Sequence, residues 1–137
     1  MRFVDTNVLL YAASLEPRDA AKQRVALDLL DEDDLAVSVQ VFQEFYSQAT
    51  RLSRPSPLTH SQALEFLVRL RTLRIHPVTL GVFQSAVQIS QRFQLSYWDA
   101  AILAAARDLG CDALYSEDMN PRQDYDGLRV INPFATP

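Results

Sequence analysis

Cysteine and lysine are nearly absent from this sequence, and long hydrophobic runs are missing altogether. Cys111 is the only cysteine, which excludes an internal disulfide framework and fits a reducing compartment. Without partner cysteines or a histidine cluster it is also a poor zinc ligand, so we expect it to be a small buried side chain. No apolar stretch is long enough to span a bilayer, and the opening Met1-Arg2-Phe3-Val4-Asp5 is not typical of a signal peptide. We therefore expect a soluble, cytoplasmic protein.

The charges are few in kind, because Lys22 is the only lysine among thirteen basic residues. Arginine is the better residue for bidentate contacts with phosphate, although genome composition explains such a bias equally well. The net charge of -4 at pH 7 argues weakly against nucleic-acid binding. Four of the acidic residues are candidates for one shared site, and their combined charge equals this net charge. A divalent cation bound among them would offset that charge locally.

Short apolar segments alternate with helical patterns along the 137 residues. The strand-like segments are residues 2–4, 35–38, 75–78, 113–116 and 128–131. Helical spacing of apolar residues predicts, among others, helices over 39–51 and 97–109. This order predicts a single domain over residues 1–137, an α/β/α sandwich with a mainly parallel sheet of about five short strands. Pro77 lacks the N–H that a strand ladder needs, so its strand is expected at an edge of the sheet.

Four carboxylates lie beside these apolar segments. Asp5 and Asp118 each follow a predicted strand, Glu44 lies within the helix over 39–51, and Asp99 lies near the start of the helix over 97–109. Ligands of open parallel sheets bind beyond the carboxyl ends of the strands. Two carboxylates about 5 Å apart repel by roughly 3 kcal/mol at an effective dielectric near 20, so a fold that gathers four of them is expected to hold a divalent cation.

Each carboxylate also has an ordinary structural explanation. Asp5 is suited to cap the helix that follows it, and Glu44 has the character of a surface glutamate on a helix. Asp99 stands three residues after Ser96, which is the spacing of a capping box, and Asp118 fits a turn. Taken singly, none of the four therefore establishes a site.

Their joint placement is what favours a shared site. Thr6, Asn7 and Ser116 are close enough in sequence to the acids to add hydroxyl or amide oxygens. His60 opens a helix and His76 lies in the expected edge strand, so we expect structural roles for both.

The residues around the acids match a known pattern. The chain resembles PIN-domain endoribonucleases, most closely the VapC-type toxins of prokaryotic toxin–antitoxin systems. The segments that carry the resemblance, in chain order, are Phe3-Val4-Asp5-Thr6-Asn7-Val8-Leu9, Gln43-Glu44-Phe45, Tyr97-Trp98-Asp99-Ala100, Tyr115-Ser116-Glu117-Asp118-Met119, Gly127-Leu128-Arg129 and Asn132-Pro133-Phe134. The third of these is the most specific, and the match extends over nearly the whole chain.

This resemblance implies a ribonuclease that depends on Mg²⁺ or Mn²⁺. The catalytic and metal-binding acids would be Asp5, Glu44, Asp99 and Asp118, with Thr6, Asn7 and Ser116 in support. Glu117 adjoins Asp118, and the family pattern favours Asp118 as the one that faces the metal. The resemblance also implies an RNA substrate, a homodimer and inhibition by a cognate VapB-type antitoxin.

Two further surfaces are expected from the sequence. Arg51 and Arg54, near the helix of Glu44 and the loop after it, are candidates to bind the RNA backbone. The helices over 9–15 and 42–49 are the expected location of an apolar groove for an antitoxin helix, with Tyr46 in contact with it.

Other functions remain open at this point. A haloacid-dehalogenase-like phosphatase or a phosphoreceiver domain also places an aspartate after the first strand. Both need a late or suitably placed lysine, whereas Lys22 comes early, and the phosphatase needs a second aspartate where this chain has Asn7. A catalytically inactive module that binds RNA or a partner is a third alternative, and metal binding would distinguish it from a nuclease.

Overall fold

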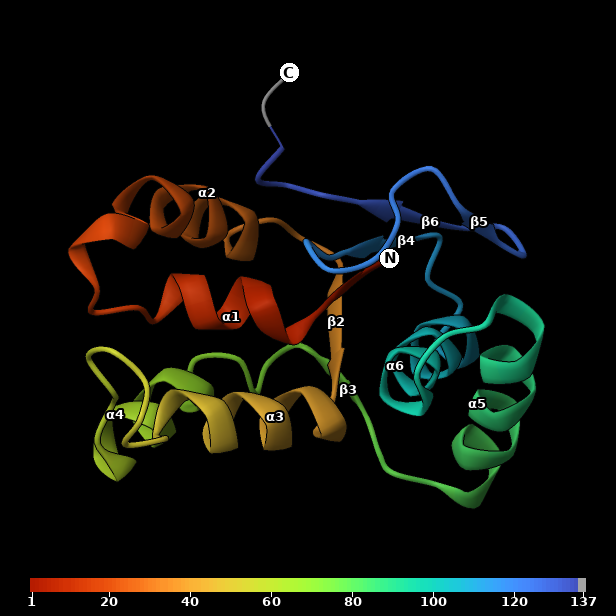
Figure 1. The fold of residues 1–137 in the computed structure, drawn as a ribbon, viewed down its shortest axis with the longest axis horizontal. Coiled ribbons are helices and arrows are strands. Elements are labelled where there is room, and N and C mark those ends of the chain that lie inside the picture. Colours follow the sequence, from red (N-terminus) through yellow and green to blue (C-terminus); the bar gives the residue numbers. More distant parts are fainter. Residues whose placement is uncertain (136–137) are drawn as a thin grey trace.

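The computed structural model describes residues 1–135, in which six strands form one sheet (Figure 1). The strands are β1 (Arg2–Val4), β2 (Leu35–Ser38), β3 (Arg74–His76), β4 (Ala113–Tyr115), β5 (Asp124–Tyr125) and β6 (Leu128–Ile131). Their order across the sheet is β3-β2-β1-β4-β6-β5, and all neighbours are parallel except β5 and β6. The predicted α/β fold with a mainly parallel sheet is confirmed. The sixth strand, β5, has only two residues, which is too short to show a strand pattern.

Helices cover both faces of this sheet. They are α1 (Thr6–Ala12), α2 (Ala20–Leu30), α3 (Val39–Ala49), α4 (His60–Val68), α5 (Leu80–Phe93) and α6 (Tyr97–Asp108), with a 3₁₀ turn η1 (Pro17–Asp19) before α2. The chain steps from β1 to β2 to β3 in one direction and then crosses back to β4 on the other side of β1. Because such crossovers are right-handed, α1 to α4 cover one face and α5 and α6 the other, as Figure 1 shows.

Side-chain caps set where the helices begin. Ser38, Thr59, Thr79 and Ser96 each accept a hydrogen bond from a backbone N–H in the first turn of α3, α4, α5 and α6. Helices α3 and α6 end at Ala49 and Asp108, two residues and one residue before the predicted ends. The differences fall within the last turn, where helix ends are poorly determined by sequence.

Strand β3 lies at one edge of the sheet, as its proline predicted. It ends at His76, so Pro77 lies just outside the ladder and not within the strand that was expected to reach residue 78. None of the helices in residues 1–135 is long and apolar enough to cross a membrane.

The core is built on the central strands and on α6. Phe3, Val37 and Leu114 from three neighbouring strands are completely buried. Residues 100–106 of α6 are all buried, because alanines on most of its faces let the sheet and α5 approach closely. Cys111 is buried and free, as expected, and burial raises the pKa of its thiol to about 11.

Leu103, at the centre of α6, gives a test of this core. It is completely buried, so Leu103→Ala should lower the free energy of unfolding by about 2–5 kcal/mol in urea titrations. Leu52 is 91% exposed, and Leu52→Ala should change stability by less than about 0.5 kcal/mol. Equal effects of the two substitutions would contradict this description of the core.

Candidate active site

The site lies at the carboxyl end of β1 and β4, where the strand order changes direction. The chain leaves β1 toward β2 on one side, whereas β4 pairs with β1 on the other side. The crevice at such a switch point is where open α/β sheets bind ligands. Asp5 immediately follows β1, and Ser116 immediately follows β4.

Asp5 is held on both oxygens. Its Oδ1 accepts a hydrogen bond from the backbone N–H of Thr6 (2.7 Å), so it does cap α1, and its Oδ2 accepts one from the Ser116 hydroxyl (2.8 Å). Only 6% of the residue is exposed. Burial raises the pKa of Asp5 to about 6; these hydrogen bonds oppose the rise, and the charges of Glu44 and Asp118 add to it.

Glu44 is half-buried on α3 and is not an ordinary surface glutamate. Its Oε1 accepts hydrogen bonds from the Thr6 hydroxyl (3.0 Å) and from Nε2 of Gln40 (3.5 Å). Burial raises its pKa, and the charges of Asp99 and Asp118 raise it further, while the two hydrogen bonds lower it. Thr6 therefore connects the loop after β1 to α3.

Asp99 lies in the first turn of α6, where its backbone N–H donates to the Ser96 hydroxyl (3.2 Å) as the capping pattern predicted. Its carboxylate is half-buried, and burial raises its pKa, with a further contribution from the charge of Asp118. Asp99 therefore takes part in the cap of α6 and also belongs to the group of acids.

Asp118 is exposed and is oriented by Asn7. The Asn7 amide donates to Oδ2 of Asp118 (3.1 Å) and to the Ser116 hydroxyl (3.3 Å), and its oxygen accepts the backbone N–H of Glu117 (3.2 Å). The three supporting residues predicted from sequence therefore all contact the acids or their loops.

The neighbouring Glu117 points elsewhere. Its carboxylate forms an ion pair with Lys22 of α2, whose ammonium also donates to the Tyr11 hydroxyl (3.1 Å). This leaves Asp118 as the acid that faces the other three. Lys22 was not among the predicted site residues, because no local pattern in the sequence pairs it with Glu117.

The four acids influence one another electrostatically, yet they do not form a ready-made metal cluster. In residues 1–135, no three side chains of His, Cys, Asp or Glu are arranged closely enough to hold a metal ion. Glu44 and Asp118 instead use carboxylate oxygens to accept hydrogen bonds from Thr6 and Asn7. The donor set itself, carboxylates with nearby hydroxyl and amide groups, is the type that a hard divalent cation prefers.

A groove of about 520 Å³ extends from Glu44 along α3. It is lined by Gln40, Gln43, Glu44, Ser47, Gln48, Arg51 and Trp98. Arg51 thus shares a hollow with one of the acids, whereas Arg54 lines a separate hollow with Leu10, Leu15 and Leu58. Gln40 and Trp98 were missed from the sequence, because neither residue type marks a site by itself.

The two histidines lie outside the acidic site. His60 Nδ1 bonds to the Tyr46 hydroxyl (2.8 Å) between α3 and α4. His76 is buried, and its ring nitrogens contact the Asp108 carboxylate and the Pro77 carbonyl oxygen. These contacts agree with the structural roles predicted for them.

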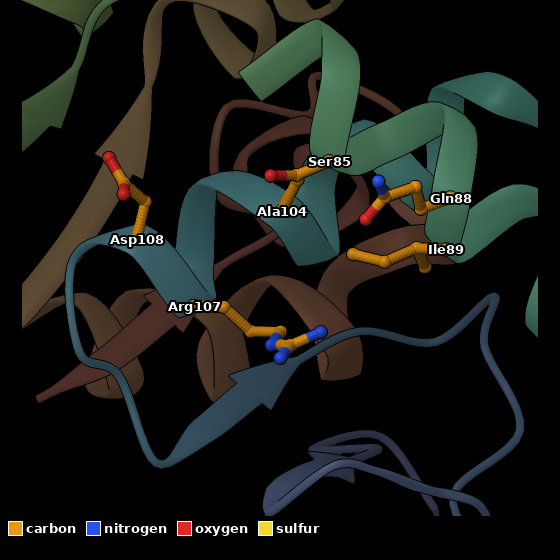
Figure 2. Close-up of a pocket in the computed structure, with 6 residues that line it drawn as sticks. All are labelled: Ser85, Gln88, Ile89, Ala104, Arg107 and Asp108. Carbon is orange, nitrogen blue, oxygen red and sulfur yellow. The ribbon is translucent and has the colours of Figure 1, made fainter. Parts of the chain in front are cut away.

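A second hollow, of about 270 Å³, lies between α5 and α6 and is distinct from the acidic site (Figure 2). It is lined by Ser85, Gln88, Ile89, Ala104, Arg107 and Asp108. Asp99 lies in the first turn of α6 and Asp108 is its last residue, so about 14 Å of helix axis separates them. Arg107 and Asp108 also contact Asp126 and His76, respectively.

Comparisons with known structures identify the fold. A toxin–antitoxin complex from Klebsiella pneumoniae is similar to this chain with a TM-score of 0.74 and 21% identity, covering 99% of this chain and 100% of that one. VapC20 from Mycobacterium tuberculosis, described as a sarcin–ricin loop cleaving toxin, gives 0.66 and 22%, covering 86% and 90%. FitAcB from Neisseria gonorrhoeae gives 0.65 and 19%, covering 99% and 100%. At these identities, the likeness shows a shared fold.

The family follows from the sequence as a whole. A comparison with curated proteins found no matching sequence. The model of the PIN domain, however, matches residues 2–123, a span that includes all four carboxylates and the elements that hold them. The chain therefore belongs to the PIN domain family.

Proposed function

We propose that this protein is a metal-dependent endoribonuclease that acts as the toxin of a type II toxin–antitoxin system. The observation that carries the proposal is that Asp5, Glu44, Asp99 and Asp118 surround the switch point of the sheet closely enough for their charges to interact. Burial and like charge raise the pKa of the first three, so the site favours an added positive charge.

The known relatives support this proposal. The chain is a PIN domain, and the structures similar to it over nearly its full length include a toxin–antitoxin complex and a toxin described as cleaving the sarcin–ricin loop. From these we propose RNA as the substrate, a cognate VapB-type antitoxin as the partner, and the cytoplasm as the place of action.

The four carboxylates would hold Mg²⁺ or Mn²⁺. When bound, such a cation lowers the pKa of a coordinated water and stabilises negative charge on the phosphate oxygens. Asp5 contributes the fixed carboxylate, because Thr6 and Ser116 hold both of its oxygens. Glu44 and Asp118 accept hydrogen bonds from the neutral side chains of Thr6 and Asn7. A bound cation would either share these carboxylate oxygens with the donors or replace the donors.

The remaining residues would bind and orient the RNA. Arg51 lies in the same groove as Glu44 and is placed to bind a phosphate of the backbone. Arg54 lines a different hollow, so we assign it a smaller part.

We assign the antitoxin to the hollow between α1 and α4. Its apolar lining ranges from the buried Ala12 and Leu58 to Leu15, which is 54% exposed. The hollow is lined by Ala12, Ala13, Leu15, Leu58, Gln62, Glu65, Phe66 and Arg69. It includes residues of the expected segment 9–15, whereas none of its lining residues belongs to the expected segment 42–49. We assign the homodimer contact to an exposed apolar surface around the start of α5, formed by Val78, Leu80 and Phe83.

Cleavage of structured RNA by the purified protein tests the proposed activity. The wild type should cut in Mg²⁺ or Mn²⁺ and stop in chelator, and Asp99→Asn should lower kcat/KM by roughly 100-fold or more, about 3 kcal/mol in the barrier. Asp112→Asn, at an exposed carboxylate before β4, is the control and should cut normally. Cleavage that survives chelator, or is equal in Asp99→Asn, would contradict the proposal.

The buried carboxylate of Asp5 predicts a pH dependence of stability in chelator. Its pKa rises from 3.8 to about 6 on folding, so its favourable contribution is complete below pH 4 and is lost as the pH rises through 6. Between pH 4 and 8 the wild type should therefore lose on the order of 3 kcal/mol of unfolding free energy relative to Asp5→Asn.

Urea titrations at a series of pH values measure this difference. The exposed Asp33→Asn should follow the wild type throughout. Addition of Mg²⁺ at pH 8 should stabilise the wild type more than Asp5→Asn. If the wild type and Asp5→Asn curves run parallel from pH 4 to 8, the carboxylate of Asp5 does not behave as described.

Charged substitutions test the assigned antitoxin surface. Leu15→Glu should weaken the complex with the cognate antitoxin by about 10-fold or more, because a charge would be buried against an apolar helix. Leu52→Glu, at the 91% exposed Leu52, should not. Tyr46→Glu tests whether the contact also extends to α3, where the sequence placed it, since Tyr46 does not line this hollow. Calorimetric titration gives the affinities, and unchanged RNA cleavage by all three variants would show that they are folded. Equal affinities would place the antitoxin elsewhere.

A further inference from the structure

Trp98 is the only tryptophan of the chain, and it is 62% exposed. It lies in the first turn of α6, whose next turns, residues 100–106, are entirely buried. The body of the helix is therefore packed into the core, whereas the indole at its start stays largely open to solvent.

The position of Trp98 is fixed although its ring is uncovered. Its carbonyl oxygen accepts a hydrogen bond from Nε2 of Gln40 (3.1 Å), which ties the start of α6 to the start of α3. The Tyr97 ring packs edge-to-face against the indole, with 5.0 Å between centroids and an angle of 81°. Tyr97 in turn packs on Phe83 (5.8 Å). The indole is therefore supported from one side and free on another.

The free side borders the groove of about 520 Å³, whose size falls in the range of about 300–1,000 Å³ typical of small-molecule sites. Opposite the indole, α3 presents residues 40, 43, 44, 47, 48 and 51, which recur at helical spacing and so share one face. Three of them are glutamines, one is serine, and the other two are Glu44 and Arg51. Amides and a hydroxyl beside one aromatic ring suit a nucleobase, which stacks on the ring and hydrogen-bonds at its edge. If the groove bound an apolar surface of another protein, we would expect aliphatic side chains to line it.

We propose that Trp98 is a stacking platform for one unpaired base of the RNA, placed directly beside the acids. The base would lie on the indole with its edge toward the glutamines of α3, and Arg51 would bind a phosphate at the far end of the groove. Trp98 adjoins Asp99 in sequence and shares the groove with Glu44, so the stacked nucleotide is next to the reacting phosphate. Such stacking requires an unpaired base, because a base inside a duplex has no free face.

This inference rests on the proposed ribonuclease activity and adds Trp98 to the residues that bind its substrate. The single tryptophan provides a direct signal, because a stacked base quenches indole fluorescence. The probes are an unstructured eight-nucleotide RNA with a terminal dye, the same RNA with abasic sites, and a hairpin that pairs the same bases. Binding is followed by dye anisotropy in Ca²⁺, under conditions in which the RNA stays intact on a gel.

The unstructured RNA should bind and quench Trp98, and the abasic RNA and the paired bases should quench much less. Trp98→Leu should weaken binding of the unstructured RNA by about 10-fold or more and raise KM more than it lowers kcat. Trp98→Phe should recover much of the loss, since phenylalanine also stacks. The control is Leu27→Ala, which changes a 42% exposed apolar residue of α2 that does not line the groove. It should bind RNA as the wild type does.

Several results would overturn the stacking role. One is RNA binding and cleavage without quenching, together with normal KM in Trp98→Leu; the ribonuclease activity would then stand and only the platform would fall. Another is loss of RNA affinity in both Trp98→Leu and Phe83→Leu, the latter at the proposed dimer surface, with a change from dimer to monomer by sedimentation, which would make Trp98 a contact between copies. If no probe binds and no RNA is cut, the ribonuclease proposal fails as well.

Discussion

The burial of the Asp5 carboxylate between β1 and β4 is the constraint on which the site depends. Hydrogen bonds from Thr6 and Ser116 hold its two oxygens and thereby join the loops that leave two neighbouring strands. The same burial raises its pKa to about 6, so ionisation opposes folding unless a positive charge arrives. The ionised Asp5 that a cation would need thus destabilises the fold when no cation is bound. Such a conflict between stability and activity is common in active sites.

The topology brings the other acids to Asp5 from opposite faces of the sheet. Glu44 comes from α3 on one face and Asp99 from α6 on the other, and a hydrogen bond from Gln40 to the Trp98 carbonyl connects the starts of these helices. Lys22 neutralises Glu117 and keeps its charge out of the cluster. The ion pair with Lys22 thus helps to define which acids of this PIN domain belong to the site, because it holds Glu117 away from the other four.

Much of the fold was predictable because its signals are local. The alternation of apolar segments with helical patterns predicted a parallel sheet, Pro77 predicted the edge strand, and the alanines of residues 100–106 predicted a buried helix. The strand β5 was not predictable, because two residues carry no periodicity and its pairing with β6 is a tertiary event. The last turns of α3 and α6 differed for a similar reason, since caps and packing set where a helix ends.

The sequence by itself determined which residue types stand after the strands and in the first turns of the helices, and hence which carboxylates were candidates. It also supplied the motifs that link them to the PIN domain. Only the tertiary structure decided the direction of each side chain: Glu117 toward Lys22, Asp118 toward Asn7, and Trp98 into the groove beside Glu44. The direction of each side chain depends on a partner that is distant along the chain. No local sequence pattern shows which distant residues the fold brings into contact.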